Sequence, residues 1–461
     1  MPPLHVGIIG AGIGGLAAAI ALRRAGAEVT VLEAAEELGE IGAGIQMTPN
    51  VSILLQRWGV SDLIGDNLVR PQELNLRRKD GTRVGHTHIP TLENNLGRVW
   101  WVVHRAHLHE GLAAKAKQLG ATIIIDARVV SVDDQNEAGK VVATTHKGAR
   151  HTFDLCIGAD GLNSVVRNTL FPDVRPEPPT TNCAYRAVVP YEQIRRDPVA
   201  RELISKPTIE VWMAPKAYII TYPICGGNVF NLVLSHHRPE KLRAMQPDVP
   251  IEELRSEYKD FDPRIKRIVD MIPESSRWPL MVTGPLKSWS SPQKNVVLMG
   301  DAAHSMVNHM AQGAATAMED GAFLAKCVGA VVQGQLSVRE AIDVYEAERM
   351  PKAHMKQQVS FINGALWHLP DGPEQRARDL AMAPGLNGKY FVRSSNLYGD
   401  DPQTVLEVYG YDAEAHAEAA LARYLDGGKD VAHPETKIVP EVEQKYTGWF
   451  LKSDSMRTGK L

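Results

Sequence analysis

The sequence predicts an α/β fold in which a Rossmann-like parallel sheet is interrupted by an inserted, mostly antiparallel sheet and followed by C-terminal helices. Three observations support this prediction. A glycine-rich turn joins a short strand at residues 5–9 to a helix at 16–24. A block of β-forming residues, broken by Pro and Gly, runs from 185 to 236. A buried strand at 296–299 leads into helices that continue to about residue 365.

The composition of the 461-residue chain is that of an ordinary globular protein, with 44% hydrophobic and 23% charged residues. Length alone predicts about two to three domains. The 51 Lys and Arg residues nearly balance the 54 Asp and Glu residues, which argues against a nucleic-acid partner. The four cysteines are widely spaced and form no CxxC pair. We therefore expect neither a disulfide framework nor a metal site.

The sequence also bears on location in the cell. No segment is long and apolar enough to suggest a membrane span, so we expect a cytoplasmic protein. The last three residues, Gly459-Lys460-Leu461, resemble a peroxisomal Ser-Lys-Leu signal only loosely. A peroxisomal location is therefore the weaker alternative.

The first motif is the glycine-rich turn and the strand that follows its helix. Gly10 permits a sharp turn, Gly12 leaves room for a pyrophosphate, and Gly15 lets the helix pack closely on the strand. The helix N-terminus offers free N–H groups to phosphates. Glu33 ends the next strand, where its carboxylate can accept hydrogen bonds from a ribose and would repel a 2′-phosphate. This pattern predicts a dinucleotide site but does not decide between NAD and FAD.

The second motif is DLCIGADGLNSVVR, residues 154–167. An apolar strand leads to Asp160-Gly161, and a helix follows. Taken alone, this motif is an ordinary strand–turn–helix unit in which an aspartate caps the helix.

The third motif is NVVLMGDAAHSMVNHMAQGAATAMED, residues 295–320. A buried strand ends at Gly300-Asp301, and a second helix opens at Gln312-Gly313-Ala314. An aspartate at a strand end can bind hydroxyl groups, and a helix N-terminus can stabilise negative charge on a ligand. An aspartate cap followed by a core helix explains the same pattern equally well.

Together the three motifs resemble those of the single-component, FAD-dependent aromatic hydroxylases, the class that includes para-hydroxybenzoate hydroxylase. Within this class the likeness is to salicylate hydroxylase, 3-hydroxybenzoate 6-hydroxylase and 6-hydroxynicotinate 3-monooxygenase. The resemblance covers about residues 5 to 350. Besides the glycine turn, the segments that support the resemblance are residues 41–50 (IGAGIQMTPN), 104–109 (HRAHLH), 158–164 and 300–304 with 312–314.

The resemblance implies a set of FAD contacts. Gly10, Gly12, Gly15 and Glu33 would hold the ADP half of FAD, and Arg105 would reach its phosphates or ribityl chain. Asp301 would bind the ribityl chain, and the backbone N–H groups of Gly313 and Ala314 would face the flavin ring. Asp160 would contact both FAD and the nicotinamide cofactor. The residues expected to bind the cofactor are therefore Gly10, Gly12, Gly15, Glu33, Arg105, Asp160, Asp301, Gly313 and Ala314.

The resemblance also implies the reaction. NADH or NADPH, bound transiently, would reduce FAD, and O2 would form a C4a-hydroperoxyflavin that hydroxylates an electron-rich ring. The site must stay dry, because water destroys this species. A small phenolic, salicylate-like aromatic compound would be the substrate, and the enzyme would be a monomer or a homodimer.

The family pattern also suggests domain boundaries. The FAD-binding domain would comprise residues 1–75, 101–180 and 286–365. The substrate domain would comprise a hairpin at 76–100 and the antiparallel block at 181–285, and a helical region would follow at 366–461.

Two positions depart from the family pattern. Asn308 stands where the family usually has a proline beside the flavin. Ala34 stands where many relatives carry a basic residue near the ADP ribose, which leaves less positive charge there.

Three residues are candidates for the base that deprotonates a phenolic substrate, or for its relay: His309, Tyr222 and Tyr218. Modest burial could bring the pKa of His309 near the working pH. Tyr218 and Tyr222 are spaced to face one side of a strand, which could be a pocket wall or the core. Arg186 could bind a substrate carboxylate or could clamp the domain interface.

Two other functions fit the same motifs. One is a FAD-dependent oxidoreductase or NADH oxidase of this fold that transfers no oxygen, and the Asn308 departure keeps this alternative open. The other is a FAD-binding protein without catalysis, which the three intact motifs disfavour.

Overall fold

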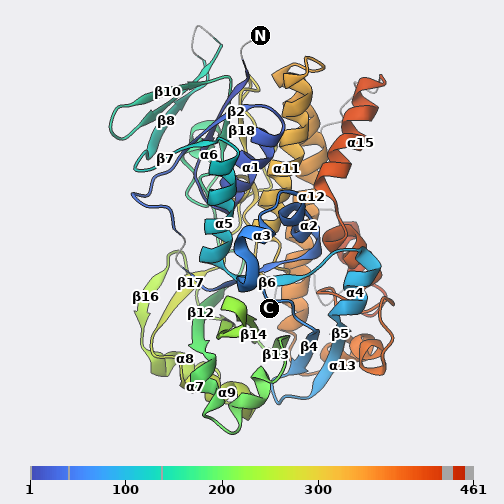
Figure 1. The fold of residues 1–461 in the computed structure, drawn as a ribbon. Coiled ribbons are helices and arrows are strands. Elements are labelled where there is room, and N and C mark those ends of the chain that lie inside the picture. The colour runs from blue at the N-terminus through green and yellow to red at the C-terminus, as the bar shows by residue number, and fades with distance from the viewer. Residues whose placement is uncertain (1–2, 40–41, 136–138, 428–439, 452–461) are drawn as a thin grey trace.

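The computed structural model describes residues 3–39, 42–135, 139–427 and 440–451, and the C-terminal tripeptide lies outside them. A five-stranded parallel sheet forms the upper part of the molecule in Figure 1. Its strand order is β18 (Val296–Leu298), β11 (Leu155–Gly158), β1 (His5–Ile9), β2 (Glu28–Leu32) and β7 (Thr122–Ile124). All neighbouring strands are parallel. The predicted parallel sheet is therefore confirmed, and it brings the three motifs, each of which follows one of these strands, to one edge.

Helices cover this sheet and build the largest core. The helices α1 (Ile13–Arg24), α5 (Arg105–Gln118) and α11 (Gly313–Val332) pack side by side, with α1 in contact with both of the others. The helices α12 (Val338–Trp367) and α15 (Ala413–Leu425) pack against α11. Their apolar faces and the sheet form one buried cluster, because each element alone would leave an apolar face in water.

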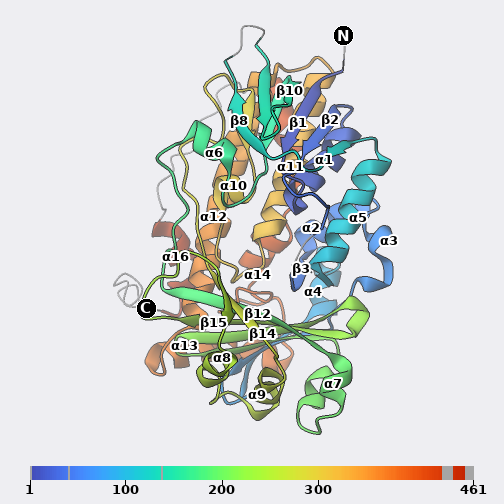
Figure 2. The same cartoon turned by 90° about the vertical axis from the view of Figure 1, so that its left-hand side faces the viewer.

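An eight-stranded sheet crosses the lower end of the molecule (Figure 2). Its strands pair antiparallel except for β13 and β4, which run parallel. The strand order is β16 (Gln246–Val249), β17 (Ser275–Pro279), β12 (Asn182–Pro190), β15 (Val229–His237), β14 (Ala217–Ile224), β13 (Thr208–Ala214), β4 (Glu73–Arg78) and β5 (Arg83–His88).

The two faces of this sheet pack on different cores. Tyr218, Ile220 and Tyr222 of β14 lie in the core that faces α12, whereas Ile219 lies in the opposite core. The period-2 spacing predicted this alternation. The outer core is covered by α7 (Tyr191–Arg195), α8 (Ile251–Glu257) and α9 (Pro263–Asp270), beneath the sheet in Figure 2.

Smaller elements complete the fold. A two-stranded pair, β3 (Gly44–Met47) and β6 (Trp101–His104), links the two large sheets. A three-stranded antiparallel sheet consists of β8 (Val129–Asp133), β9 (Val141–Thr145) and β10 (Arg150–Phe153). The remaining helices are α2 (Pro49–Arg57), α3 (Ser61–Ile64), α4 (Ile89–Leu96), α6 (Val165–Leu170), α10 (Asp301–His304), α13 (Pro373–Met382), α14 (Pro402–Thr404) and α16 (Pro440–Thr447), with short 3-10 or π turns at 65–67, 200–204, 225–227, 383–387 and 405–409.

The region after residue 370 is helical in pieces, with α15 ending at Leu425. Among the described helices, none is long and apolar enough to cross a membrane. No group of three or more potential metal ligands occurs in the described part of the chain. The domain boundaries drawn from the sequence remain a proposal.

The contact between α1 and α11 yields a stability prediction. A Cβ at Gly321 of α11 would lie 2.9 Å from Cα of Ala18, so the variant Gly321→Ala must push the two helices apart. We expect it to lower the free energy of unfolding by about 1–3 kcal/mol, measured by urea denaturation. Gly329→Ala in the same helix is the control. Its Cβ meets only Ala25 at 3.6 Å, an ordinary contact, so it should be neutral or slightly stabilising. Equal effects of the two variants would contradict this packing.

Candidate active site

The glycine turn between β1 and α1 is shaped by close backbone contacts. Gly10 has a φ of +102°, and a Cβ there would lie 2.6 Å from the carbonyl oxygen of Ala159. A Cβ at Gly15 would lie 2.0 Å from the carbonyl oxygen of Gly10. A Cβ at Gly12 would meet nothing within 4 Å. Gly10 and Gly15 are therefore required by the fold, whereas Gly12 leaves open space beside the turn.

Two side chains hold this turn in place. The Glu33 carboxylate accepts hydrogen bonds from the backbone N–H groups of Ala11 and Ala35, at 2.6 and 2.8 Å. His109 Nε2 lies 2.7 Å from the carbonyl oxygen of Ala11, and this histidine is buried. Glu33 is thus partly engaged by the turn, but a carboxylate has further lone pairs for a ribose.

An outer cavity of about 660 Å³ lies along the turn. Its walls include Glu33, Arg105, Asp160 and Arg128. Arg128, just before β8, was not predicted from the sequence. Arg128 gives this cavity a positive charge, like the basic residue that many relatives carry at the position of Ala34. A single arginine in a loop carries no pattern that would have identified it.

Asp160 caps a helix. Its carboxylate accepts hydrogen bonds from the Ser164 hydroxyl and from the backbone N–H of Val165, at 2.7 Å for the latter. Burial raises the pKa of Asp160. The residue also lines the outer cavity, and its contact with FAD and the nicotinamide cofactor stays a prediction.

An inner cavity of about 320 Å³ continues from the outer one, because Gly12 and Arg105 line both. Asp301, the first residue of α10, is exposed to it. Gly313 and Ala314 begin α11 at its wall. Because these first two residues of α11 line the cavity, the positive dipole end of the helix lies at its wall, and no acidic residue in the first turn offsets this charge.

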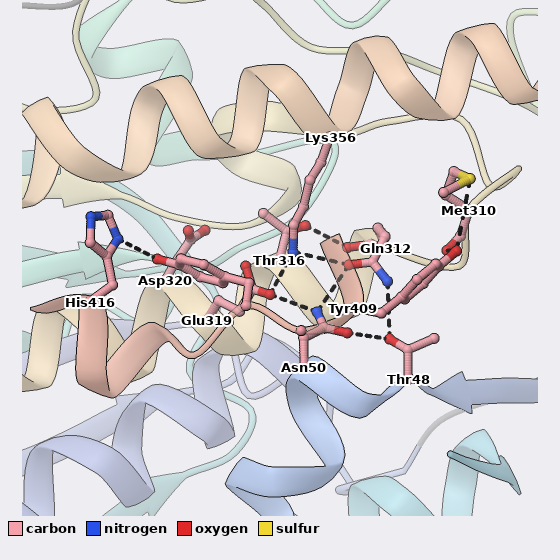
Figure 3. Close-up of polar contacts among 12 residues, drawn as sticks. Thr48, Asn50, Met310, Gln312, Thr316, Glu319, Asp320, Lys356, Tyr409 and His416 are labelled. Atoms are coloured by element: carbon pink, nitrogen blue, oxygen red, sulfur yellow. Dashed lines mark hydrogen bonds and ion pairs between the residues drawn. The ribbon is translucent and has the colours of Figure 1, made fainter. Parts of the chain in front are cut away.

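A buried hydrogen-bond network holds the start of α11 (Figure 3). The Gln312 amide donates to Thr48 Oγ1 at 3.0 Å, and its oxygen accepts from Asn50 Nδ2 and Lys356 Nζ, each at 3.0 Å. Asn50 and Lys356 also donate to Glu319 Oε1, at 2.6 and 2.5 Å. Burial lowers the pKa of Lys356 to about 8. The network thus joins α2, α11 and α12 directly behind the inner cavity.

The neighbouring carboxylate, Asp320, fixes the Gly300–His304 segment. It accepts hydrogen bonds from the Gly300 backbone N–H at 3.1 Å and from His304 Nε2 at 2.6 Å. Arg349 donates to Asp320 at 2.9 Å and to the Tyr411 hydroxyl at 2.9 Å. Burial opposes ionisation, but His304 and Arg349 hold the pKa of Asp320 below its ordinary value. No sequence pattern predicted this network, because its members are scattered along the chain.

The other wall of the inner cavity comes from the eight-stranded sheet. Ile220 and Tyr222 of β14 and Val233 of β15 face the cavity, and Tyr398 joins them from the C-terminal region. Burial raises the pKa of Tyr222, so its hydroxyl stays protonated at neutral pH. This wall is therefore mostly apolar, with two phenolic hydroxyls.

Arg186 of β12 is the cation on this wall. Its guanidinium carbon lies 5.6 Å from the ring centroid of Trp278, and the side chain lines the inner cavity. Its guanidinium makes no hydrogen bond or ion pair with the described residues, so no such contact supports the alternative of an interface clamp. The side chain is exposed and lines the cavity, and desolvation together with nearby Arg105 lowers its pKa. Such a site favours an anionic ligand.

Tyr218 and His309 lie behind the cavity wall. The Tyr218 hydroxyl lies 3.0 Å from His309 Nδ1 and donates to Asn308 Oδ1 at 3.3 Å. Both residues are buried, and the described lining of the inner cavity includes Asn308 but neither of them. Burial lowers the pKa of His309 to about 3. The expectation of a pKa near the working pH was therefore wrong, because this side chain is buried completely.

Comparison with known proteins identifies the family. A family model described as "FAD binding domain" matches residues 4–360. The chain belongs to this FAD-binding family. It is 35% identical over 433 residues to "FAD-dependent monooxygenase OpS4" of Beauveria bassiana, covering 91% of this chain and 98% of that protein. It is 31% identical over 403 residues to "3-hydroxybenzoate 6-hydroxylase" of Klebsiella oxytoca, covering 87% and 98%.

Solved structures share the fold. The "Salicylate hydroxylase substrate complex" matches with a TM-score of 0.71 and 22% identity, over 94% of this chain and 99% of that one. A structure of "CtdE in complex with FAD and substrate 4" matches with a TM-score of 0.76 and 20% identity, over 92% and 99%. The expected fold, with its FAD-binding part, antiparallel sheet and C-terminal helices, is confirmed. The protein is a FAD-dependent monooxygenase of the aromatic hydroxylase group.

The residues present fit FAD. The two cavities form one path from Glu33, past the open position beside Gly12, to the N-terminus of α11. Backbone N–H groups and Arg105 are placed along this path for an anionic, phosphate-bearing ligand. The eight-stranded sheet closes the far end of the path.

The buried His309 predicts how stability depends on pH. Its pKa is about 3 in the folded protein and 6.5 in an unfolded chain, so between these values the unfolded state binds more protons. The free energy of unfolding should therefore fall as the pH falls from 6.5, with a loss from this residue on the order of 1–2 kcal/mol at pH 5. His309→Gln should lessen the drop in Tm between pH 7 and pH 5. The exposed His88, replaced by Gln, is the control. An equal drop in Tm between pH 7 and pH 5 in the wild type and both variants would contradict the lowered pKa of His309.

Proposed function

We propose that this monooxygenase hydroxylates a phenolic acid of the salicylate class, with O2 and transiently bound NADH or NADPH as co-substrates. The observation that carries the proposal is Arg186, whose guanidinium faces the inner cavity and makes no ion pair within the described part of the chain. A carboxylate on the substrate ring would supply the missing anion. The names of the related 3-hydroxybenzoate 6-hydroxylases, which refer to aromatic acids, agree with this proposal.

The cofactor contacts expected from the sequence form part of the same proposal. Gly10 and Gly15 shape the turn, Gly12 gives the pyrophosphate access, and Glu33 accepts hydrogen bonds from the ribose. Arg105 and Asp301 line the inner cavity, where they would bind the phosphates and the ribityl chain. The flavin ring would lie at the N-terminus of α11.

Asp160, Gly313 and Ala314 complete these contacts. Asp160 would fix the loop that both cofactors approach, through its bonds to α6. The N–H groups of Gly313 and Ala314 would stabilise negative charge on the reduced flavin ring. FAD, when bound, supplies electron transfer from the nicotinamide and the transfer of one oxygen atom to the substrate ring.

The sheet wall would orient the substrate and exclude water. Ile220, Val233 and Met306 present apolar surface to the inner cavity. Because burial keeps Tyr222 protonated, this residue would donate a hydrogen bond to the substrate oxygen rather than accept its proton. Tyr218 and His309 would act from behind the cavity wall as positioning residues, because His309 contacts Tyr218 and Tyr218 donates a hydrogen bond to Asn308. We expect a monomer or a homodimer.

The test of the proposed function is a coupled assay of the purified flavoprotein. NADH and NADPH oxidation would be followed with salicylate, 3-hydroxybenzoate and related acids, and products would be identified by mass. Stimulated oxidation with a product that gains one oxygen atom is the expected result. Stimulated oxidation that yields hydrogen peroxide and no such product would instead support an oxidase without oxygen transfer. If only neutral phenols stimulate NADH or NADPH oxidation, a phenolic acid is excluded as the substrate.

Arg186→Gln should weaken the binding of a phenolic acid selectively. Loss of a charge-assisted hydrogen bond is worth about 1.5–3 kcal/mol, so we expect KM for salicylate to rise about tenfold to hundredfold. The KM for phenol, which has no carboxylate, should change little. Arg186→Lys keeps the charge without the planar fork and should have an intermediate effect. Equal changes for salicylate and phenol would contradict a carboxylate contact.

A further inference from the structure

Gln46 is a buried amide in the wall of the inner cavity. It lies on β3, between the two large sheets, and is 3% exposed. Its side chain lines the cavity together with Tyr222 and Tyr398. A polar side chain buried to this degree needs hydrogen-bond partners for both ends of its amide.

The orientation of this amide is fixed by Trp100. The indole Nε1 lies 3.2 Å from Gln46 Oε1, and an indole N–H can only donate. The oxygen end of the amide must therefore face Trp100, and the NH2 end must point elsewhere. Tyr398 lines the cavity with Gln46, and because the amide carries two N–H groups, an interaction with the Tyr398 hydroxyl would engage at most one of them. The other N–H group is available to a ligand in the cavity.

Trp100 is itself held firmly. It is completely buried, and its backbone N–H donates to Glu93 Oε1 at 2.7 Å. Its ring packs against Tyr398 and Tyr409, with ring centroids 5.9 and 5.2 Å apart. The amide of Gln46 therefore cannot turn over without leaving a buried indole N–H unpaired, which costs free energy.

The C-terminal region contributes to this arrangement. Tyr398 follows Asn396, whose amide donates to Thr87 Oγ1 of β5 at 3.0 Å. This contact ties the segment that carries Tyr398 to the eight-stranded sheet. The position of Tyr398 beside Gln46 is thus set by residues far apart in the chain.

We propose that Gln46 is a specificity-determining residue that donates an N–H hydrogen bond to the phenolic oxygen of the substrate, with Tyr398 beside it. This inference rests on the proposed function. Arg186 on β12 and Gln46 on β3 line the cavity from different strands. A hydroxybenzoate that binds Arg186 through its carboxylate and Gln46 through its phenolic oxygen would have its ring fixed in one orientation. A benzoate without the hydroxyl would lack the second contact.

The test compares ligands in the FAD-bound enzyme through the change each causes in the flavin absorbance spectrum. Kd would be measured for salicylate and for benzoate in the wild type, in Gln46→Met and in Gln118→Met, the last being the same change at an exposed position of α5. We expect the wild type and Gln118→Met to prefer salicylate. In Gln46→Met this preference should fall about tenfold to hundredfold, while Kd for benzoate changes little.

A second variant separates this effect from a loss of folding. Gln46→Glu keeps an oxygen acceptor for Trp100 but replaces the N–H donor with a carboxylate that repels a phenolate. It too should lose the preference for salicylate. An unchanged preference in either variant would overturn the role of Gln46 and leave the proposed function intact. If neither acid perturbs the flavin of the wild type, the proposed function fails, and this inference fails with it.

Discussion

The site depends on one cluster of buried charges behind it. Glu319 and Asp320 of α11 lie between Arg349 and Lys356 of α12, and all four side chains are completely buried. Buried charges are tolerated only when they are paired and hydrogen-bonded, so each carboxylate must keep its partners. Asn50 and Lys356 connect Glu319 to Gln312 at the start of α11 (Figure 3). Asp320 accepts a hydrogen bond from Gly300, which lines the inner cavity. The cluster therefore fixes how the start of α11 faces the inner cavity.

The two walls of the inner cavity have different chemistry for a physical reason. The wall toward the parallel sheet is made of backbone turns and a helix N-terminus, which suit a cofactor that carries phosphates and develops negative charge. The wall from the eight-stranded sheet is made of side chains on alternate positions of strands, so its composition can vary without disturbing the sheet. Arg186, Tyr222 and Gln46 lie at or beside this variable wall. In the proposed function, the fold thus sets the cofactor, and a few side chains of the sheet wall would set the substrate.

Much of this could be predicted from local sequence. The glycine turn, the strand before Asp160 and the alternation along β14 are short-range patterns, and the structure has each of them. The features that could not be predicted depend on long-range packing. Asn50 and Gln312 are 262 positions apart in the chain, and no local pattern links them. His309 lies in a loop, where exposure would be ordinary, but it packs so closely on α12 that a Cβ at Gly364 would lie 2.2 Å from its ring. Arg128 and Gln46 could not be singled out from the sequence, because only the folded chain places them in the walls of the two cavities.

The most direct test of the account is a crystal structure of the FAD-bound enzyme with salicylate. We expect the flavin ring to lie against the N-terminus of α11 in the inner cavity. We also expect the carboxylate of salicylate within hydrogen-bond distance of Arg186 on the sheet wall. Salicylate bound outside this cavity, or bound inside it with its carboxylate away from Arg186, would contradict the account.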